Sequence, residues 1–296
     1  MTIDVMDRKT GSLNRRAEGG VIVKRFLSRK GLPVALLLSI LSAAPAAAAQ
    51  PVAVSGTGSS LSSIKLLSEP FMKGNPQVRI DVLPALGTTG AVKAVLAGKL
   101  DIGVGGRPLK EEERKGGVVA VPYARVPFVF GVHRGVKTTG ITLREAAAIY
   151  AGKKTAWDDG SPIRLILRPE GESDLEILRG MSKEMAAAVN IALRRKGMIY
   201  AMNDQESADA IERTPGAFGA VTLTMVTLGN RSIRVLPLDG VLPTGKSLND
   251  GIYPHSKDFF FITGKATSGA ARSFIEFARS RDGAAILSRA GFVPVR

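Results

Sequence analysis

Glycine and small hydroxyl residues gather at four places where a predicted strand gives way to a predicted helix. They are GTGSSLSS at 56–63, LGTTGAVKAV at 86–95, DIGVGGRPL at 101–109 and RPEGESD at 168–174. Glycines let the backbone approach a ligand closely, and hydroxyls with helix N-terminal amides donate hydrogen bonds without adding charge. A single junction of this type is explained by helix capping alone. Four in one chain indicate a site for a small anion.

The elements around these junctions predict where they lie. Short apolar runs such as VAVSG (52–56) and VRIDVL (78–83) alternate with amphipathic stretches such as 59–73. This alternation predicts an α/β fold with mostly parallel strands. In open sheets of this class, ligands bind beyond the carboxyl ends of the strands, which is where all four junctions fall. We therefore expect the junctions to converge on one anion.

The same reading predicts the remaining elements of the chain. Further strands are expected at 100–106, 118–123, 126–133, 162–168, 216–223, 233–238 and 259–264. Further helices are expected at 91–98, 143–152, 183–197, 268–280 and 282–290. The runs at 118–123 and 126–133 are continuously apolar, which is typical of strands that are buried on both faces.

Residues 1–49 have the composition of an export signal. Basic residues from Lys24 to Lys30 precede the apolar run LPVALLLSIL (32–41), and the small residues AAPAAAA end at Ala49. The apolar run is shorter than the roughly twenty residues that a membrane-spanning helix needs. We expect export of the chain and cleavage near Ala49.

The composition narrows the possible partners. The first 49 residues carry a net +5 of the chain's +15, which leaves +10 for the rest. This charge favours anionic partners, but the basic residues are dispersed and no nucleic-acid-binding motif appears. The chain has no cysteine and only His133 and His255, so neither thiolate nor multi-histidine metal sites are available. We expect no cofactor and no nucleic-acid partner.

Several longer segments, in order, carry a family resemblance. They are GTGSS (56–60), GTTGAVKAVLAGKLDIGVGGRPL (87–109), IYAGKKTAWDDGSPIRLILRPEG (149–171), PGAFG (215–219) and an ending that includes FIEFARSRDGAAILSRAGFVPV (274–295). From about residue 51 to 296 the chain resembles the periplasmic substrate-binding proteins of ABC importers, in particular their phosphate-binding branch.

The resemblance implies a two-lobed α/β fold of the type II periplasmic-binding-protein class, with mixed sheets and crossing hinge strands. Lobe 1 would comprise residues 51–131 with 254–296, and lobe 2 would comprise 132–253. A phosphate-like oxyanion would be clamped between the lobes and delivered to an inner-membrane ABC permease. We expect a monomer without enzymatic activity.

The resemblance also implies the ligand-binding residues. The family's hydroxyl loops fall on Gly58, Ser59, Ser60 and Leu61, and on Thr88 and Thr89. A family aspartate that accepts a proton from the anion falls on Gly106. The family's arginine loop falls on Arg168 to Asp174, where Arg168 and Gly171 match, and Glu172, Ser173 and Asp174 replace Ser, Gly and Thr. Arg168 and Arg107 are the expected charged anchors.

The acids of the RPEGESD loop need separate explanations, because ionised carboxylates facing a bound anion would repel it. We expect most of them to point away, with Asp174 or Ser173 capping a helix that starts at Leu175 and Glu170 in solvent. Glu172 would either accept a proton from a protonated oxyanion or select a ligand that carries its own donor, such as an amino or hydroxyl group beside the anion. Glu172→Gln is accordingly expected to change the preferred ligand.

Two other functions stay open. A sensor or scaffold module outside the cytoplasm could use the same fold. A phosphate-ester hydrolase would need a metal cluster, or a nucleophile beside a base. Neither histidine lies in a candidate loop, which disfavours the hydrolase.

Overall fold

A computed structural model describes residues 49–295. The predicted export signal therefore lies outside the described residues, apart from Ala49. Within them, the strands form one ten-stranded mixed sheet in the order β2-β1-β3-β9-β4-β7-β5-β6, with β8 and β10 also paired to β4. No helix in this part of the chain has the length and apolar character needed to cross a membrane.

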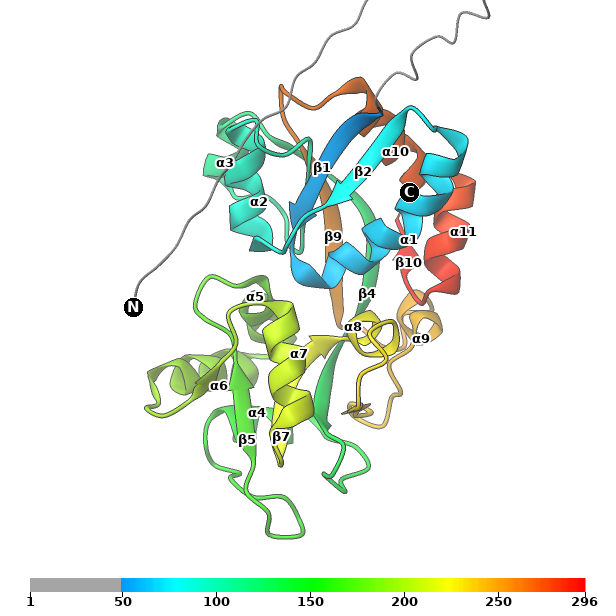
Figure 1. Ribbon diagram of the computed structural model, residues 1–296. Helices are drawn as coiled ribbons and strands as arrows, with labels where there is room; N and C mark the ends of the chain where they lie inside the picture. Colours follow the sequence, from blue (N-terminus) through cyan, green and yellow to red (C-terminus); the bar gives the residue numbers. More distant parts are fainter. Residues whose placement is uncertain (1–48, 296) are drawn as a thin grey trace, which may run out of the picture. The chain divides into compact units, whose positions relative to one another are not determined.

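Lobe 1 is formed by the two ends of the described chain (Figure 1). Its elements are β1 (Gln50–Gly56), α1 (Gly58–Gly74), β2 (Val78–Val82), α2 (Gly87–Leu96), β3 (Ile102–Gly105), α3 (Glu111–Lys115), β9 (Ser256–Thr263), α10 (Gly269–Arg279), α11 (Arg281–Arg289) and β10 (Val293–Pro294).

Lobe 2 is formed by the middle of the chain, coloured green to yellow in Figure 1. Its elements are α4 (Leu143–Tyr150), β5 (Arg164–Leu167), α5 (Ser173–Met181), α6 (Lys183–Arg194), β6 (Ile199–Tyr200), α7 (Asp204–Arg213), β7 (Ala217–Thr222), α8 (Leu223–Thr227) and β8 (Ile233–Val235). The short helix α9 (Gly245–Asn249) follows and packs against β4 and β10.

The strand β4 (Val119–His133) connects the two lobes. Its first part pairs with β9 in lobe 1, and residues from Phe128 onward pair with β7 in lobe 2. The sequence predicted two strands here, at 118–123 and 126–133. The structure has one strand, because an irregularity between Pro122 and Ala124 shifts the register without ending the pairing.

The expectation of mostly parallel strands is wrong. Of the nine strand pairs within residues 49–295, five are antiparallel. Four of the five involve β4, which is antiparallel to β7, β8, β9 and β10, and the fifth joins β3 to β9. Strand direction of this kind depends on the whole connection, and short apolar runs do not encode it.

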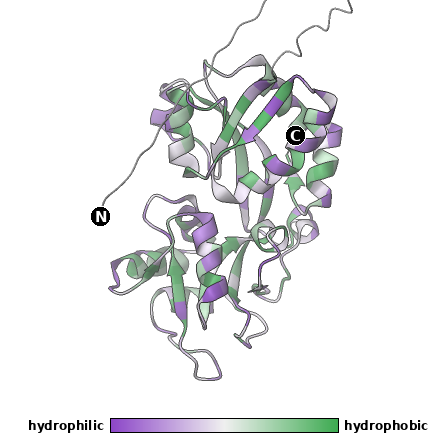
Figure 2. Ribbon diagram, in the orientation of Figure 1, coloured by the Kyte–Doolittle hydropathy of each residue, from purple (hydrophilic) through white to green (hydrophobic). Residues whose placement is uncertain are grey.

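Each lobe has its own hydrophobic core. In lobe 1, Phe71 packs edge-on against Phe274 with ring centroids 5.3 Å apart. In lobe 2, Phe130 stacks on Phe218 at 5.1 Å, and Trp157 meets the same ring edge-on. Figure 2 shows hydrophobic residues along the central strands and a largely hydrophilic α7. Buried aromatic rings, worth about 1.5–3 kcal/mol each, hold each lobe together.

Candidate functional site

The start of α7 places a carboxylate against the start of α1. Asn203 caps α7, because its side-chain oxygen accepts a hydrogen bond from the Glu206 amide at 2.9 Å. Asp204 is therefore fixed as the first residue of the helix. Its carboxylate reaches from lobe 2 into lobe 1, and only 7% of the residue is exposed.

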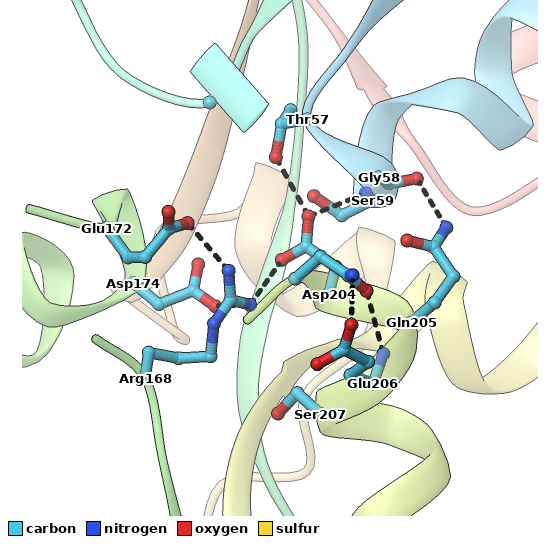
Figure 3. Close-up of polar contacts among 12 residues, drawn as sticks. Thr57, Gly58, Ser59, Arg168, Glu172, Asp174, Asp204, Gln205, Glu206 and Ser207 are labelled. Atoms are coloured by element: carbon cyan, nitrogen blue, oxygen red, sulfur yellow. Dashed lines mark hydrogen bonds and ion pairs between the residues drawn. The ribbon is translucent and has the colours of Figure 1, made fainter. Parts of the chain in front are cut away.

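Four donors surround this carboxylate. Figure 3 shows the contacts with Thr57, Ser59 and Arg168. Oδ2 of Asp204 accepts from the Thr57 hydroxyl at 2.8 Å and from the Ser59 amide at 2.9 Å. Oδ1 accepts from Lys257 Nζ at 2.9 Å and from an Arg168 nitrogen at 3.2 Å. The Ser59 amide belongs to the first turn of α1, where the free N–H groups and the helix dipole favour negative charge.

Lys257 makes a second contact across the lobes. It lies in β9 and is 1% exposed, and its Nζ donates to Asp174 Oδ1 at 2.5 Å as well as to Asp204. Asp174 belongs to the first turn of α5 in lobe 2 and is 2% exposed. An ammonium group from lobe 1 is therefore held between two carboxylates from lobe 2.

Arg168 is the second cation of the site. It follows β5 and is 4% exposed. One terminal nitrogen donates to Asp174 and to Asp204, both at 3.2 Å, and the other donates to Glu172 at 2.6 Å. Figure 3 shows the Arg168 guanidinium lying between these acidic side chains.

We call these residues the cleft cluster, and they come from both lobes. Its members are Thr57, Ser59 and Lys257 from lobe 1, and Arg168, Glu172, Asp174 and Asp204 from lobe 2. With all side chains ionised, two cations face three carboxylates. The cluster is buried apart from Glu172, whose side chain is 33% exposed.

Charge pairing overcomes burial for the two central ions. Burial by itself would raise the pKa of Asp204, but Lys257, Arg168 and the Ser59 amide outweigh it and hold that pKa well below the usual range. Burial would likewise lower the pKa of Lys257, but Asp174 and Asp204 raise it above its ordinary value. Both residues are therefore charged at neutral pH.

Gly106 touches this cluster and leaves room for Lys257. A Cβ atom at position 106 would lie 2.7 Å from Lys257 Cε and 3.2 Å from Ser173 Oγ. Any other residue at this position would have to displace the buried lysine. The side-chain space at Gly106, where the family resemblance implies an aspartate, is thus taken by a cation from β9.

The structure brings some predicted ligand residues into the cluster or beside it. Ser59, Arg168 and Glu172 are members, and Gly106 and Ser173 adjoin it. Gly58 contacts lobe 2 through its carbonyl oxygen, which accepts from the Gln205 side chain at 3.3 Å. Whether any of these residues contacts a ligand remains a prediction.

Other predicted ligand residues make contacts within lobe 1. Leu61 belongs to the lobe 1 core, and the Ser60 hydroxyl donates to the Thr57 carbonyl oxygen. Thr88 accepts from the Gly106 amide at 2.9 Å. Arg107 makes a two-pronged pair with buried Glu113, with both distances at 2.8 Å, and reaches Thr89 at 3.2 Å.

The predicted capping role of Ser173 or Asp174 in the RPEGESD loop is wrong. Neither Ser173 nor Asp174 caps a helix starting at Leu175, because α5 begins at Ser173 and its N-cap is Glu172, without a side-chain hydrogen bond. Asp174 and Glu172 point toward Arg168, since the buried guanidinium and Lys257 need counter-charges. Glu170 does lie at the surface, paired with Arg179 at 2.8 Å.

Sequence reasoning missed Asp204 and Lys257. The helix α7 was not predicted, although Ser207, Ala208 and Ile211 follow Asp204 at helical spacing and Asn203 is a good N-cap. Lys257 lies two residues before the predicted strand at 259–264. Lys257 is two residues before buried Phe259 and four before buried Phe261 in β9, and this two-residue spacing was the available signal that its side chain faces the interior.

Glu172 provides a pH test of the cluster. Burial, together with Asp174 and Asp204, raises its pKa above the ordinary 4.5 despite Arg168. The folded protein therefore holds a proton that the unfolded chain has released just above pH 4.5, so this group lowers stability as pH rises through that window. Glu172→Gln should remove this loss of stability. The free energy of unfolding should rise by no more than about 1 kcal/mol, because the side chain is partly exposed.

The measurement is urea unfolding at several pH values between about 4 and 7. Glu170→Gln is the matched control, since Arg179 lowers the pKa of Glu170 and gives the opposite slope. A Glu172→Gln variant with the same pH profile as the parent chain would contradict this account of the site.

The chain is similar to proteins of known classes. Residues 41–282 match the family model described as the PBP superfamily domain. The phosphate-binding protein PstS of Bacillus subtilis is 26% identical over 255 residues, which cover 82% of this chain and 80% of that protein. Protein SphX of Synechococcus elongatus is 26% identical over 291 residues, covering 89% and 84%.

A solved structure has the same fold. The crystal structure of a putative phosphate ABC transporter substrate-binding protein with bound phosphate from Clostridium perfringens superposes with a TM-score of 0.72. It is 22% identical, and the match covers 83% of this chain and all of that one. The family model extends over most of both lobes, so this chain belongs to the PBP superfamily.

Proposed function

We propose that the chain is an extracytoplasmic solute-binding protein that captures phosphate, or a phosphate-like oxyanion, between its lobes and delivers it to an ABC importer. The relatives named PstS and SphX support this proposal, as does the neighbour with bound phosphate. We propose residues 51–131 with 254–296 as lobe 1 and 132–253 as lobe 2. The protein would act in the periplasm as a monomer, after cleavage near Ala49, and would catalyse no reaction.

One observation carries the proposal. The Asp204 carboxylate, itself an oxyanion, receives hydrogen bonds from a hydroxyl, a helix N-terminal amide, an ammonium and a guanidinium. These donors come from both lobes and meet at one buried point. The same donor set suits a small tetrahedral anion, because charge-assisted bonds to guanidinium and ammonium groups are strong. An anion that accepts hydrogen bonds from both lobes would favour their closed arrangement.

The sensor or scaffold function remains the second candidate. It is favoured by the fact that every cation of the cleft cluster is already paired with carboxylates of the same chain. A module that closes without a solute would need no importer. The two candidates differ in whether a free anion stabilises the protein.

A thermal-unfolding panel on the purified protein tests the proposal. Phosphate, sulfate, molybdate and a phosphonate are added separately at neutral pH. An anion that binds only the folded state and is present at about 100 times its dissociation constant should stabilise the fold by about 2.7 kcal/mol. We expect this response for phosphate. A protein that responds to none of the four anions would contradict solute capture and favour the scaffold.

A further inference from the structure

The cleft cluster has opposite charge on its two sides. Lobe 1 contributes Lys257 together with the Thr57 hydroxyl and the α1 N-terminus, which makes a site for negative charge. Lobe 2 contributes Arg168 with Glu172, Asp174 and Asp204, which is net negative when these groups are ionised. The two lobes therefore attract each other even when no free ion is bound between them.

The direct contacts leave no space for an ion between the lobes. Lys257 lies 2.5 Å from Asp174 and 2.9 Å from Asp204, and the Ser59 amide lies 2.9 Å from Asp204. A phosphate group could enter only if the Asp204 carboxylate withdrew. If it entered with all acids in place, two cations would face three carboxylates and the new anion, at high electrostatic cost in a buried site.

Two donors in the cluster are not used by Asp204. The Ser59 hydroxyl and Arg168 Nε are buried and have no hydrogen-bond partner among residues 49–295. Buried polar groups are normally satisfied, so these two point to a missing acceptor. A carboxylate has two oxygens and a tetrahedral oxyanion has four, which would supply the additional acceptors.

We propose that the Asp204 carboxylate takes the place of the bound oxyanion when the site is empty, and that Asp204 and the free anion compete for Thr57, Ser59 and Lys257. This inference rests on the proposed function and extends it. The ligand-free cleft closes on the chain's own carboxylate. Asp204 thereby lowers the affinity for free anions, and an anion must displace it to bind.

The variant Asp204→Ala tests the inference. It leaves Lys257 and Arg168 opposite Asp174 and Glu172, so the charges remain balanced. Asp209→Ala is the matched control, because it removes the same charge from the same helix at a partly exposed side chain that pairs with Arg231, outside the cleft cluster. Circular dichroism checks that each variant is folded.

Two measurements are made on each protein. Phosphate affinity is measured by isothermal titration calorimetry. Lobe closure is measured as the distance between two spin labels. The labels are attached to cysteines introduced at the exposed positions Lys93 in α2 and Lys183 in α6. These are the only two labelling sites, because the natural chain has no cysteine. The distance is recorded with no addition, with phosphate and with formate, which can fill the space of the missing carboxylate.

We expect Asp204→Ala to bind phosphate at least about tenfold more tightly than the parent, equivalent to about 1.4 kcal/mol. Without ligand, the distance between the two labels in Asp204→Ala should be longer than in the parent, and phosphate or formate should shorten it again. Asp209→Ala should match the parent in both phosphate affinity and label distance. If formate closes Asp204→Ala and phosphate does not, the inference is supported but phosphate is contradicted as the ligand. An Asp204→Ala variant that stays closed and binds phosphate no more tightly would overturn the inference, while phosphate binding by the parent would keep the proposed function.

Discussion

Replacing Lys257 by Met is expected to lower the free energy of unfolding by about 3–5 kcal/mol, the cost of breaking a buried ion pair from one side. Lys257 is 1% exposed and lies between Asp174 and Asp204. Met has a similar length and no charge. The two carboxylates would remain buried with Arg168 as their only cation within the cleft cluster.

The pH dependence of this effect has a definite sign. In the parent, the raised pKa of Lys257 gives stability that is present below its ordinary value of 10.5 and is lost as pH rises through the folded value. The lowered pKa of Asp204 gives stability that is present above its ordinary value of 3.8 and is lost as pH falls. Without Lys257, burial is opposed only by Arg168 and the Ser59 amide, so the pKa of Asp204 should lie higher than in the parent. Acidification should therefore narrow the difference in the free energy of unfolding between Lys257→Met and the parent.

Urea unfolding at pH values between about 2 and 9 measures the loss of stability at neutral pH and its narrowing below the ordinary Asp204 pKa of 3.8. Lys99→Met, at an exposed position of lobe 1, is the control and should stay within about 0.5 kcal/mol of the parent. Adding Asp174→Asn to Lys257→Met should recover part of the loss, because one unpaired carboxylate is removed. A Lys257→Met variant as stable as the parent at neutral pH would show that the lysine contributes no net stability.

Arg168→Ala is expected to weaken phosphate binding at least about 100-fold, equivalent to about 2.7 kcal/mol. Arg168 is the cation that lobe 2 contributes to the cleft cluster, and it lies between Glu172, Asp174 and Asp204. Without it, three carboxylates would face a bound anion with Lys257 as the only remaining cation of the cluster. Each lost charge-assisted hydrogen bond is worth about 1.5–3 kcal/mol.

Calorimetric titration with phosphate provides the comparison. Arg164→Ala is the matched control, since Arg164 begins the same strand, β5, at an exposed position. Arg168→Lys should fall between Arg168→Ala and the parent, because lysine keeps the charge but loses the planar fork that reaches several acceptors. Unchanged phosphate affinity in Arg168→Ala would remove this arginine from the proposed site.

Several parts of the fold follow from local sequence. The helix starts near residues 58, 87 and 173 were predicted to within a few residues from glycines, hydroxyl residues and apolar spacing. These signals act over a few residues, since they fix backbone conformation and capping at the junction itself. The junctions also meet in the structure, where Gly106 contacts Thr88 and adjoins Ser173.

The elements that complete the site were not predicted. The helix α7 is largely polar, so its short buried face is a weak pattern. The strand β9 was predicted from its aromatic residues, and its start at Ser256 was missed. The pairing of Asp204 with α1 joins residues 145 positions apart, and no spacing rule covers such a distance.

The sequence by itself determined the class of fold, the positions of the glycine and hydroxyl junctions, and the presence of Arg168 beside several acids. Only the tertiary structure decided which charges neutralise each other. Lys257 from β9, Asp174 from α5 and Asp204 from α7 become one cluster because β4 and β9 bring the two lobes together. In a buried site of reduced dielectric, an ion is stable only beside its partner, and that partner is chosen by the packing of distant segments.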